Sequence, residues 1–91
     1  MKTAHTILIV DDEAHILQVL SLKLRNCGYA VRTAVDGEDA LHQVKTNTPD
    51  LVITDVQMPY MNGLELAHAL YADKATSNVP IIVLTARGHN L

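Results

Sequence analysis

The segment Ile7-Leu8-Ile9-Val10-Asp11-Asp12 places four apolar residues directly before two carboxylates. A short apolar run rich in β-branched residues is typical of a strand that is buried on both faces, as in a parallel sheet. Two similar runs occur later in the chain, over residues 51–53 and 81–84. Residues 31–35 alternate instead, which predicts a half-exposed strand at an edge of the sheet.

Segments with helical periodicity separate these strands. Residues 14–27 form an apolar stripe that ends in Cys27, which we predict to be a core residue, and Gly28 fits a left-handed helix end. Asp36 is suited to cap a second helix that stops before Pro49, and Asn62 with Glu65 predicts a capping box at the start of a third. The apolar positions expected to face the core are Ala40, Leu41 and Val44 in the second helix, and Leu64, Ala67 and Leu70 in the third.

The predicted order is β-α-β-α-β-α-β, which indicates a doubly wound α/β sheet with right-handed crossovers. The 91 residues allow one domain, residues 1–91, and the absence of Phe and Trp makes its core aliphatic. A net charge of −3 does not favour binding to nucleic acid or to an anionic membrane, which basic surfaces attract. One cysteine excludes an internal disulfide, and no apolar run is long enough to span a bilayer. We therefore expect a cytoplasmic protein.

Carboxylates follow two of the buried strands. Asp11 and Asp12 end the first strand and Asp55 ends the third, and ligands of such sheets bind beyond the carboxyl ends of the strands. Taken separately, an acidic pair can cap a helix and a single Asp can start a turn. Together, three carboxylates repel one another unless a cation lies among them, and hard oxygen ligands favour Mg²⁺.

The segment after Asp55 is restrained. Pro59 fixes its own φ and keeps Met58 extended, so the loop can direct the backbone carbonyl of Gln57 at a metal ion. Gly63, taken alone, is more simply explained by the turn into the third helix.

Three motifs together resemble a response-regulator receiver domain: Asp11-Asp12 after a strand, the stretch from Asp55 to Gly63, and residues 80–86. The resemblance runs in register through the whole chain. It implies a flavodoxin-like, CheY-like fold with strand order 2-1-3-4, and a signalling switch rather than an enzyme. Its phosphoryl donor would be a sensor histidine kinase or a phosphotransfer protein.

The resemblance also implies a role for each motif residue. Asp55 matches the phosphoacceptor. Asp11, Asp12 and the carbonyl of Gln57 match the ligands that hold Mg²⁺ together with Asp55. Thr85 matches the switch residue that contacts the phosphoryl group, and Ala86 matches the small residue that keeps the phosphate accessible.

The family's domain continues after the fourth strand with a fourth helix, a fifth strand and a fifth helix, whereas this sequence stops at Leu91. The lysine that pairs with the phosphate lies on that fifth strand, so it has no counterpart here. Arg87 is a candidate substitute cation, although a solvated loop arginine is the simpler interpretation. The fourth strand becomes an apolar sheet edge, which predicts poor stability or dimerisation through residues 81–84.

Three functions remain open from the sequence. The first is a phosphoacceptor receiver, with an effector domain possible beyond the C-terminus. The second is a receiver-like interaction module that is not phosphorylated because the lysine is missing. The third, a small Mg²⁺-dependent phosphatase, requires a second Asp two residues after Asp55, where Gln57 stands instead.

Overall fold

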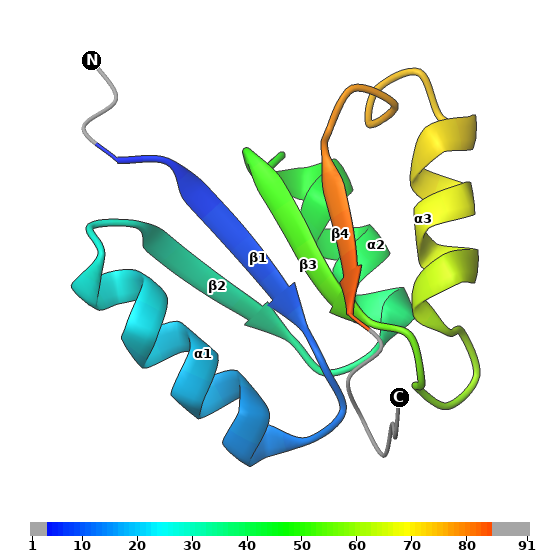
Figure 1. The fold of residues 1–91 in the computed structure, drawn as a ribbon. Helices are drawn as coiled ribbons and strands as arrows, with labels where there is room; N and C mark the ends of the chain where they lie inside the picture. The colour runs from blue at the N-terminus through cyan, green and yellow to red at the C-terminus, as the bar shows by residue number, and fades with distance from the viewer. Residues whose placement is uncertain (1–3, 85–91) are drawn as a thin grey trace.

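The computed structural model describes residues 4–84, which form a four-stranded parallel sheet with helices on both faces (Figure 1). The elements are β1 (Thr6–Val10), α1 (Ala14–Asn26), β2 (Ala30–Ala34), α2 (Gly37–Thr46), β3 (Leu51–Asp55), α3 (Gly63–Ala72) and β4 (Ile81–Leu84). The strand order is β2-β1-β3-β4, and every neighbouring pair is parallel. The predicted α/β fold and strand order are therefore confirmed.

Strand β1 lies inside the sheet, between β2 and β3. Ile9 is in register with Thr33 on one side and with Ile53 on the other. The four residues 7–10 are at most 3% exposed. This burial confirms that the continuous apolar run marks a strand covered on both faces, whereas β2 is at an edge, as its alternating sequence predicts.

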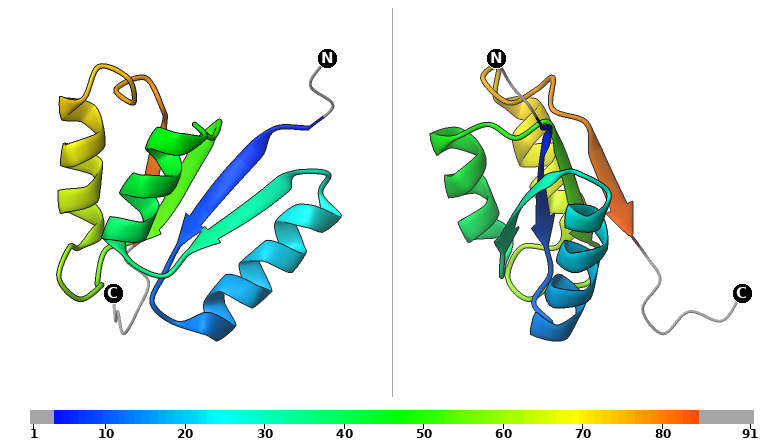
Figure 2. Two further views of the ribbon diagram at one scale, coloured as in Figure 1. Left: turned by 180° about the vertical axis from the view of Figure 1, so that it is seen from behind. Right: turned by 90° about the vertical axis from the view of Figure 1, so that its left-hand side faces the viewer.

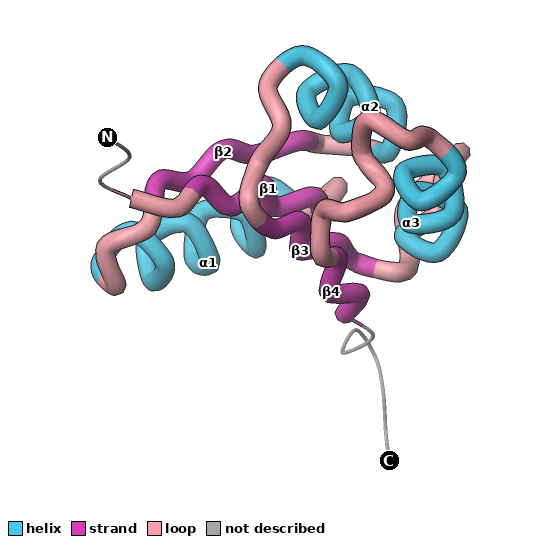
Figure 3. The backbone as a smooth tube through the Cα atoms, turned by 90° about the horizontal axis from the view of Figure 1, so that it is seen from above, coloured by secondary structure: helices cyan, strands magenta, loops and turns pink. Residues whose placement is uncertain are grey.

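The two faces of the sheet are covered differently. Seen along the sheet in Figure 2, α1 lies on one side, and α2 and α3 lie on the other; the view from above in Figure 3 shows the same division. The side of α2 and α3 holds a cluster of ten buried residues that includes Leu8, Val52, Leu66 and Leu70. The side of α1 holds a cluster of only three buried residues, Ile7, Ile9 and Leu17.

The predicted helix ends are confirmed. Asp36 caps α2, since its Oδ1 accepts the Asp39 N–H at 2.8 Å. Asn62 and Glu65 form the capping box of α3, with hydrogen bonds of 2.8 and 2.9 Å. Gly28 has a φ of +98°, the left-handed conformation expected after α1.

Two predictions about helix faces are wrong. Cys27 is exposed, because α1 ends at Asn26 and the chain leaves the helical path before Cys27 can follow the apolar stripe. In α3 the buried positions are Gly63, Leu66 and Leu70, while Leu64 is 61% exposed. The helix thus presents a face one residue away from the predicted one, although Leu70 belongs to both.

Strand β4 is the edge of the described sheet next to β3, as expected. Its side chains alternate, so that Ile82 and Leu84 are 46% and 38% exposed. Among residues 4–84, no helix is long and apolar enough to cross a bilayer. Thr85, Ala86 and Arg87 lie outside the described residues.

Candidate functional site

Three carboxylates converge at the C-terminal ends of β1 and β3. Asp11 and Asp12 directly follow β1, and Asp55 is the last residue of β3. Strands β1 and β3 are neighbours in the sheet. Each side chain offers an oxygen, and these three oxygens lie within 4.8 Å of one another. Asp11 and Asp55 are 7% and 6% exposed, whereas Asp12 is exposed. The predicted convergence of the strand-end acids is confirmed.

Local hydrogen bonds orient the first of these acids. The Asp11 N–H donates to the carbonyl of Ala34 at 3.1 Å, which continues the β1–β2 pairing beyond the strand. The Asp11 Oδ1 accepts the Glu13 N–H at 2.9 Å, which turns the chain toward α1. The position of the Asp11 carboxylate is therefore set by both the sheet and the following turn.

Asp55 is held through its backbone. The buried hydroxyl of Thr54 donates to the Asp55 carbonyl at 3.0 Å. The N–H of Val56, which follows Asp55, donates to the Leu84 carbonyl of β4 at 3.0 Å. Asp55 is thus fixed at the point where β3 ends, and its carboxylate faces the other acids of the cluster.

The donor set fits a hard divalent cation. All three side chains of the cluster supply carboxylate oxygens, and neither His nor Cys belongs to it. Three negative charges this close raise the free energy of the site unless a cation screens them. Mg²⁺ typically takes one or two carboxylates and keeps several water ligands, which suits a cluster with one exposed member.

The segment from Val56 to Asn62, which we call the β3–α3 loop, borders this cluster. The Gly63 N–H donates to the Val56 carbonyl at 3.0 Å and closes the loop at its base. A Cβ on Gly63 would collide with the backbone carbonyl of Asp55, so only glycine allows α3 to begin this close to Asp55. The structure thereby supports the turn interpretation of Gly63.

A surface pocket of about 530 Å³ lies between the loop and the cluster. It is lined by acidic, amide and apolar side chains of the two strand-end segments and α3: Asp12, Val56, Gln57, Met58, Pro59, Asn62 and Leu64. Gln57 is exposed and lines the same pocket as Asp12, so the structure brings this predicted residue next to the acids. Met58 is instead buried, with its Sδ 3.9 Å from the Thr54 hydroxyl.

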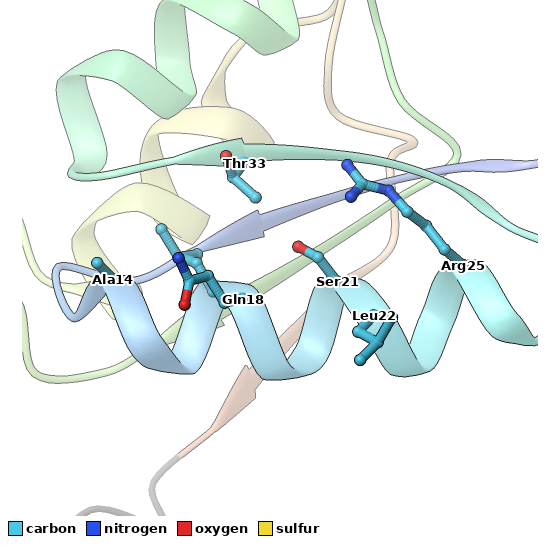
Figure 4. A pocket seen from close by; sticks show the side chains of 7 residues that line it. Ala14, Gln18, Ser21, Leu22, Arg25 and Thr33 are labelled. Carbon is cyan, nitrogen blue, oxygen red and sulfur yellow. The ribbon is translucent and has the colours of Figure 1, made fainter.

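A second pocket, of about 500 Å³, lies between α1 and β2 (Figure 4). Ser21 and Arg25 point from α1 toward β2, and Arg25 Nη2 donates to the Val31 carbonyl at 3.2 Å. None of the residues that line this pocket is acidic. The acidic cluster beside the β3–α3 loop is therefore the stronger candidate for chemistry.

Comparison with known proteins places this arrangement in a family. The sequence profile of the response regulator receiver domain matches residues 7–90. The chain belongs to the response regulator receiver domain family. This receiver domain is 44% identical, over 97% of its length, to the probable transcriptional regulator ycf27 of Guillardia theta. It is 43% identical, over 89% of its length, to the alkaline phosphatase synthesis transcriptional regulatory protein PhoP of Bacillus subtilis.

The receiver domain described here spans about a third of the length of these curated relatives, 34% of the first and 33% of the second. Among solved structures, a putative response regulator from Chloroflexus aurantiacus superposes with a TM-score of 0.89 at 43% identity. The chemotaxis response regulator CheY4 of Vibrio cholerae superposes with a TM-score of 0.88 at 37% identity. The alignments cover 94% and 96% of this chain, and 70% and 72% of those chains.

Sequence reasoning missed three residues that shape the site. Thr54 stands out only as a hydroxyl at the end of an apolar run, which is a signal that could have been used. Gly37 is the first residue of α2 and Met61 lies in the β3–α3 loop, and the two meet only in the folded chain. No spacing in the sequence indicates the contact between Gly37 and Met61.

Proposed function

We propose that Asp55 is the phosphoacceptor of this receiver domain and takes a phosphoryl group from a phosphohistidine of a sensor kinase or a phosphotransfer protein. The observation that carries the proposal is the convergence of Asp11, Asp12 and Asp55 within 4.8 Å at the strand ends. A carboxylate side chain can act as a nucleophile and form a covalent acyl phosphate.

The transfer is a displacement at phosphorus. One carboxylate oxygen of Asp55 forms a bond to the phosphorus atom while the phosphorus–nitrogen bond of the donor breaks, and the bonding electron pair remains on the imidazole nitrogen. When bound, Mg²⁺ neutralises the charge that spreads over the equatorial phosphoryl oxygens. Asp11, Asp12, Asp55 and the backbone carbonyl of Gln57 would hold the ion.

The protein contributes mainly position. The strand pairing of β1 and β3 keeps Asp11 and Asp55 side by side, and both are nearly buried, so few conformations of either side chain are available. Such fixed placement lowers the entropic part of the barrier. Thr85 as the phosphoryl contact and switch, and Ala86 as the residue that leaves access to it, complete the proposal from the family resemblance.

Intact-mass spectrometry after incubation with acetyl phosphate and Mg²⁺ tests the proposal. We expect a single phosphoryl adduct that is absent from Asp55→Asn and absent without Mg²⁺. Asp50→Asn is the matched control, because Asp50 directly precedes β3 at the opposite end of the same strand and accepts the Thr6 N–H. An adduct that persists in Asp55→Asn would refute Asp55 as the acceptor.

A second candidate function is an interaction module that is not phosphorylated. The exposed apolar side chains of Ile82 and Leu84 on the edge strand β4 favour it. We expect the 91-residue chain to dimerise through β4 at micromolar concentration, which sedimentation equilibrium measures. A folded monomer that takes no phosphoryl group from acetyl phosphate would argue against both candidates.

The wider setting of the domain follows from its family. We propose that residues 1–91 belong to a single receiver domain. The relatives named above are transcriptional regulators of about three times this length, so we propose that an effector domain follows and that this domain itself makes no contact with DNA. A cytoplasmic location is expected for a partner of such kinases.

A further inference from the structure

We propose that Gly37 and Met61 form a brace that positions the β3–α3 loop beside the acidic cluster. Neither residue supplies a ligand, so both would act as positioning residues. The inference rests on the proposed function, because the loop matters for chemistry only if Mg²⁺ and a phosphoryl group are bound next to it.

Gly37, the first residue of α2, lies directly against the side chain of Met61. A Cβ on Gly37 would lie 2.7 Å from both the Cβ and the Sδ of Met61, and 2.8 Å from its Cγ. The Cβ of Met61 cannot swing away by a rotamer change, because it is attached to the backbone. An alanine at position 37 must therefore displace the backbone of the loop itself.

Backbone conformation does not require glycine at position 37. Gly28 is glycine at a φ of +98°, whereas Gly37 does not have a positive φ and is the first residue of α2. The close approach of Met61 is thus what requires glycine here, and Gly37 is buried beneath it.

The β3–α3 loop is restrained at several points, so it cannot easily accommodate a displacement of Met61. Its base is closed by the hydrogen bond from Gly63 to Val56, and one side is anchored by the buried side chain of Met58. Between these points Tyr60 has a φ of +69°, and the Met61 N–H donates to the Pro59 carbonyl at 2.7 Å. Such a tight turn transmits a shift of Met61 toward Gln57 and Pro59, which line the pocket beside Asp12.

The segment from Ala34, the last residue of β2, to Gly37, the first residue of α2, also contacts the other half of the site. Ala34, three residues before Gly37, accepts the N–H of Asp11 at 3.1 Å. This segment therefore contacts the backbone of Asp11 at its β2 end and the β3–α3 loop at its α2 end. This common support keeps the two segments that line the pocket in a fixed relation.

A double-mutant cycle tests the brace, with Mg²⁺ affinity measured by titration of amide NMR shifts and folding measured by thermal unfolding. We expect Gly37→Ala to weaken Mg²⁺ binding about tenfold, the size typical for residues that orient metal ligands. Met61→Gly removes the support, including the Cβ that a methyl group at position 37 would meet, and weakens binding less. In the double variant Gly37→Ala/Met61→Gly, the added methyl group occupies the space left by the Met61 side chain, and we expect affinity within about twofold of the parent chain.

Gly28→Ala is the control for stability alone. Nothing lies within 4 Å of a Cβ placed there, but the positive φ strains an alanine, so this variant loses stability without a reason to lose Mg²⁺ affinity. Unchanged affinity in Gly37→Ala, or a double variant as weak as Gly37→Ala, would overturn the brace. If Gly37→Ala does not fold, Met61→Gly and the double variant are compared, and equal affinities would overturn the brace.

The Mg²⁺ titration and the phosphorylation assay distinguish a failure of the proposed function from a failure of the brace. If the amide NMR shifts of the parent chain do not saturate with added Mg²⁺, both the proposed function and the brace are wrong. If the parent chain binds Mg²⁺ and takes a phosphoryl group while the cycle shows no coupling between positions 37 and 61, only the brace is wrong.

Discussion

The two faces of the sheet differ in how much apolar surface they bury. Below α2 and α3, ten buried residues form one continuous cluster, and Met58 of the β3–α3 loop is among them. Below α1, three buried residues form the cluster, and the surrounding Leu20, Leu24 and Ile53 are only partly buried. The loop that borders the acidic site is therefore attached to the densely packed face.

The face covered by α1, which we call the open face, leaves apolar surface accessible. It carries an apolar surface pocket of about 570 Å³ at the end of the sheet opposite the acids, with Ile7, Leu24 and Ile53 among its lining residues. The two faces thus have different roles in the described structure. The face of α2 and α3 holds the loop beside the acids, while the face of α1 leaves apolar surface accessible.

The largest expected loss of stability comes from a substitution on the face covered by α2 and α3, which we call the dense face. Leu66 is fully buried in α3, so Leu66→Ala removes its contacts and leaves a cavity, and we expect a loss of about 3 kcal/mol in the free energy of unfolding. A domain of this size is stable by only about 5–10 kcal/mol. Urea denaturation followed by circular dichroism measures the loss, and a loss below about 1 kcal/mol would contradict the dense packing.

The matched substitution on the open face is Leu20→Ala in α1. Leu20 is partly buried against Ile7, Ile9 and Leu17, so less apolar surface is lost than at Leu66. We expect a cost of about 1.5 kcal/mol by the same denaturation experiment. Equal losses for Leu66→Ala and Leu20→Ala would show that the two faces contribute alike, and the comparison would fail.

A smaller effect is expected from the cap of α3. Asn62→Ala removes the acceptor of the Glu65 N–H and frees the Glu65 side chain from its return hydrogen bond. We expect a loss of about 1 kcal/mol. The N-cap of α1, Glu13, makes no side-chain cap hydrogen bond, so α1 has no counterpart of this contribution. Hydrogen exchange of the first turn of α3 distinguishes local fraying from global unfolding.

The smallest effect is expected at the outer surface of α1. Leu22 is 62% exposed, and Leu22→Gln is expected to change stability by less than about 0.5 kcal/mol. Thermal unfolding measures it, with Leu20→Ala as the comparison on the same helix. A loss as large as that of Leu20→Ala would mean that Leu22 is covered in solution, for example by a second copy of the chain.

The element order, the buried strand β1 and the helix caps were predictable because they depend on local patterns. A run such as Ile7–Val10 specifies a buried strand, and Asp36 or Asn62 specifies a helix start, through contacts within a few residues. The acidic site was predictable for a related reason. Once the strands are parallel and adjacent, residues that directly follow them meet at one edge, as Asp11 and Asp55 do.

The tertiary structure alone decided which helix face is buried and how the loop is supported. Leu64 and Leu66 are both apolar, and only the docking of α3 on β4 and α2 selects Leu66 for the core. Met61 meets Gly37 because two helices pack side by side, a contact between residues far apart in sequence that no local pattern records.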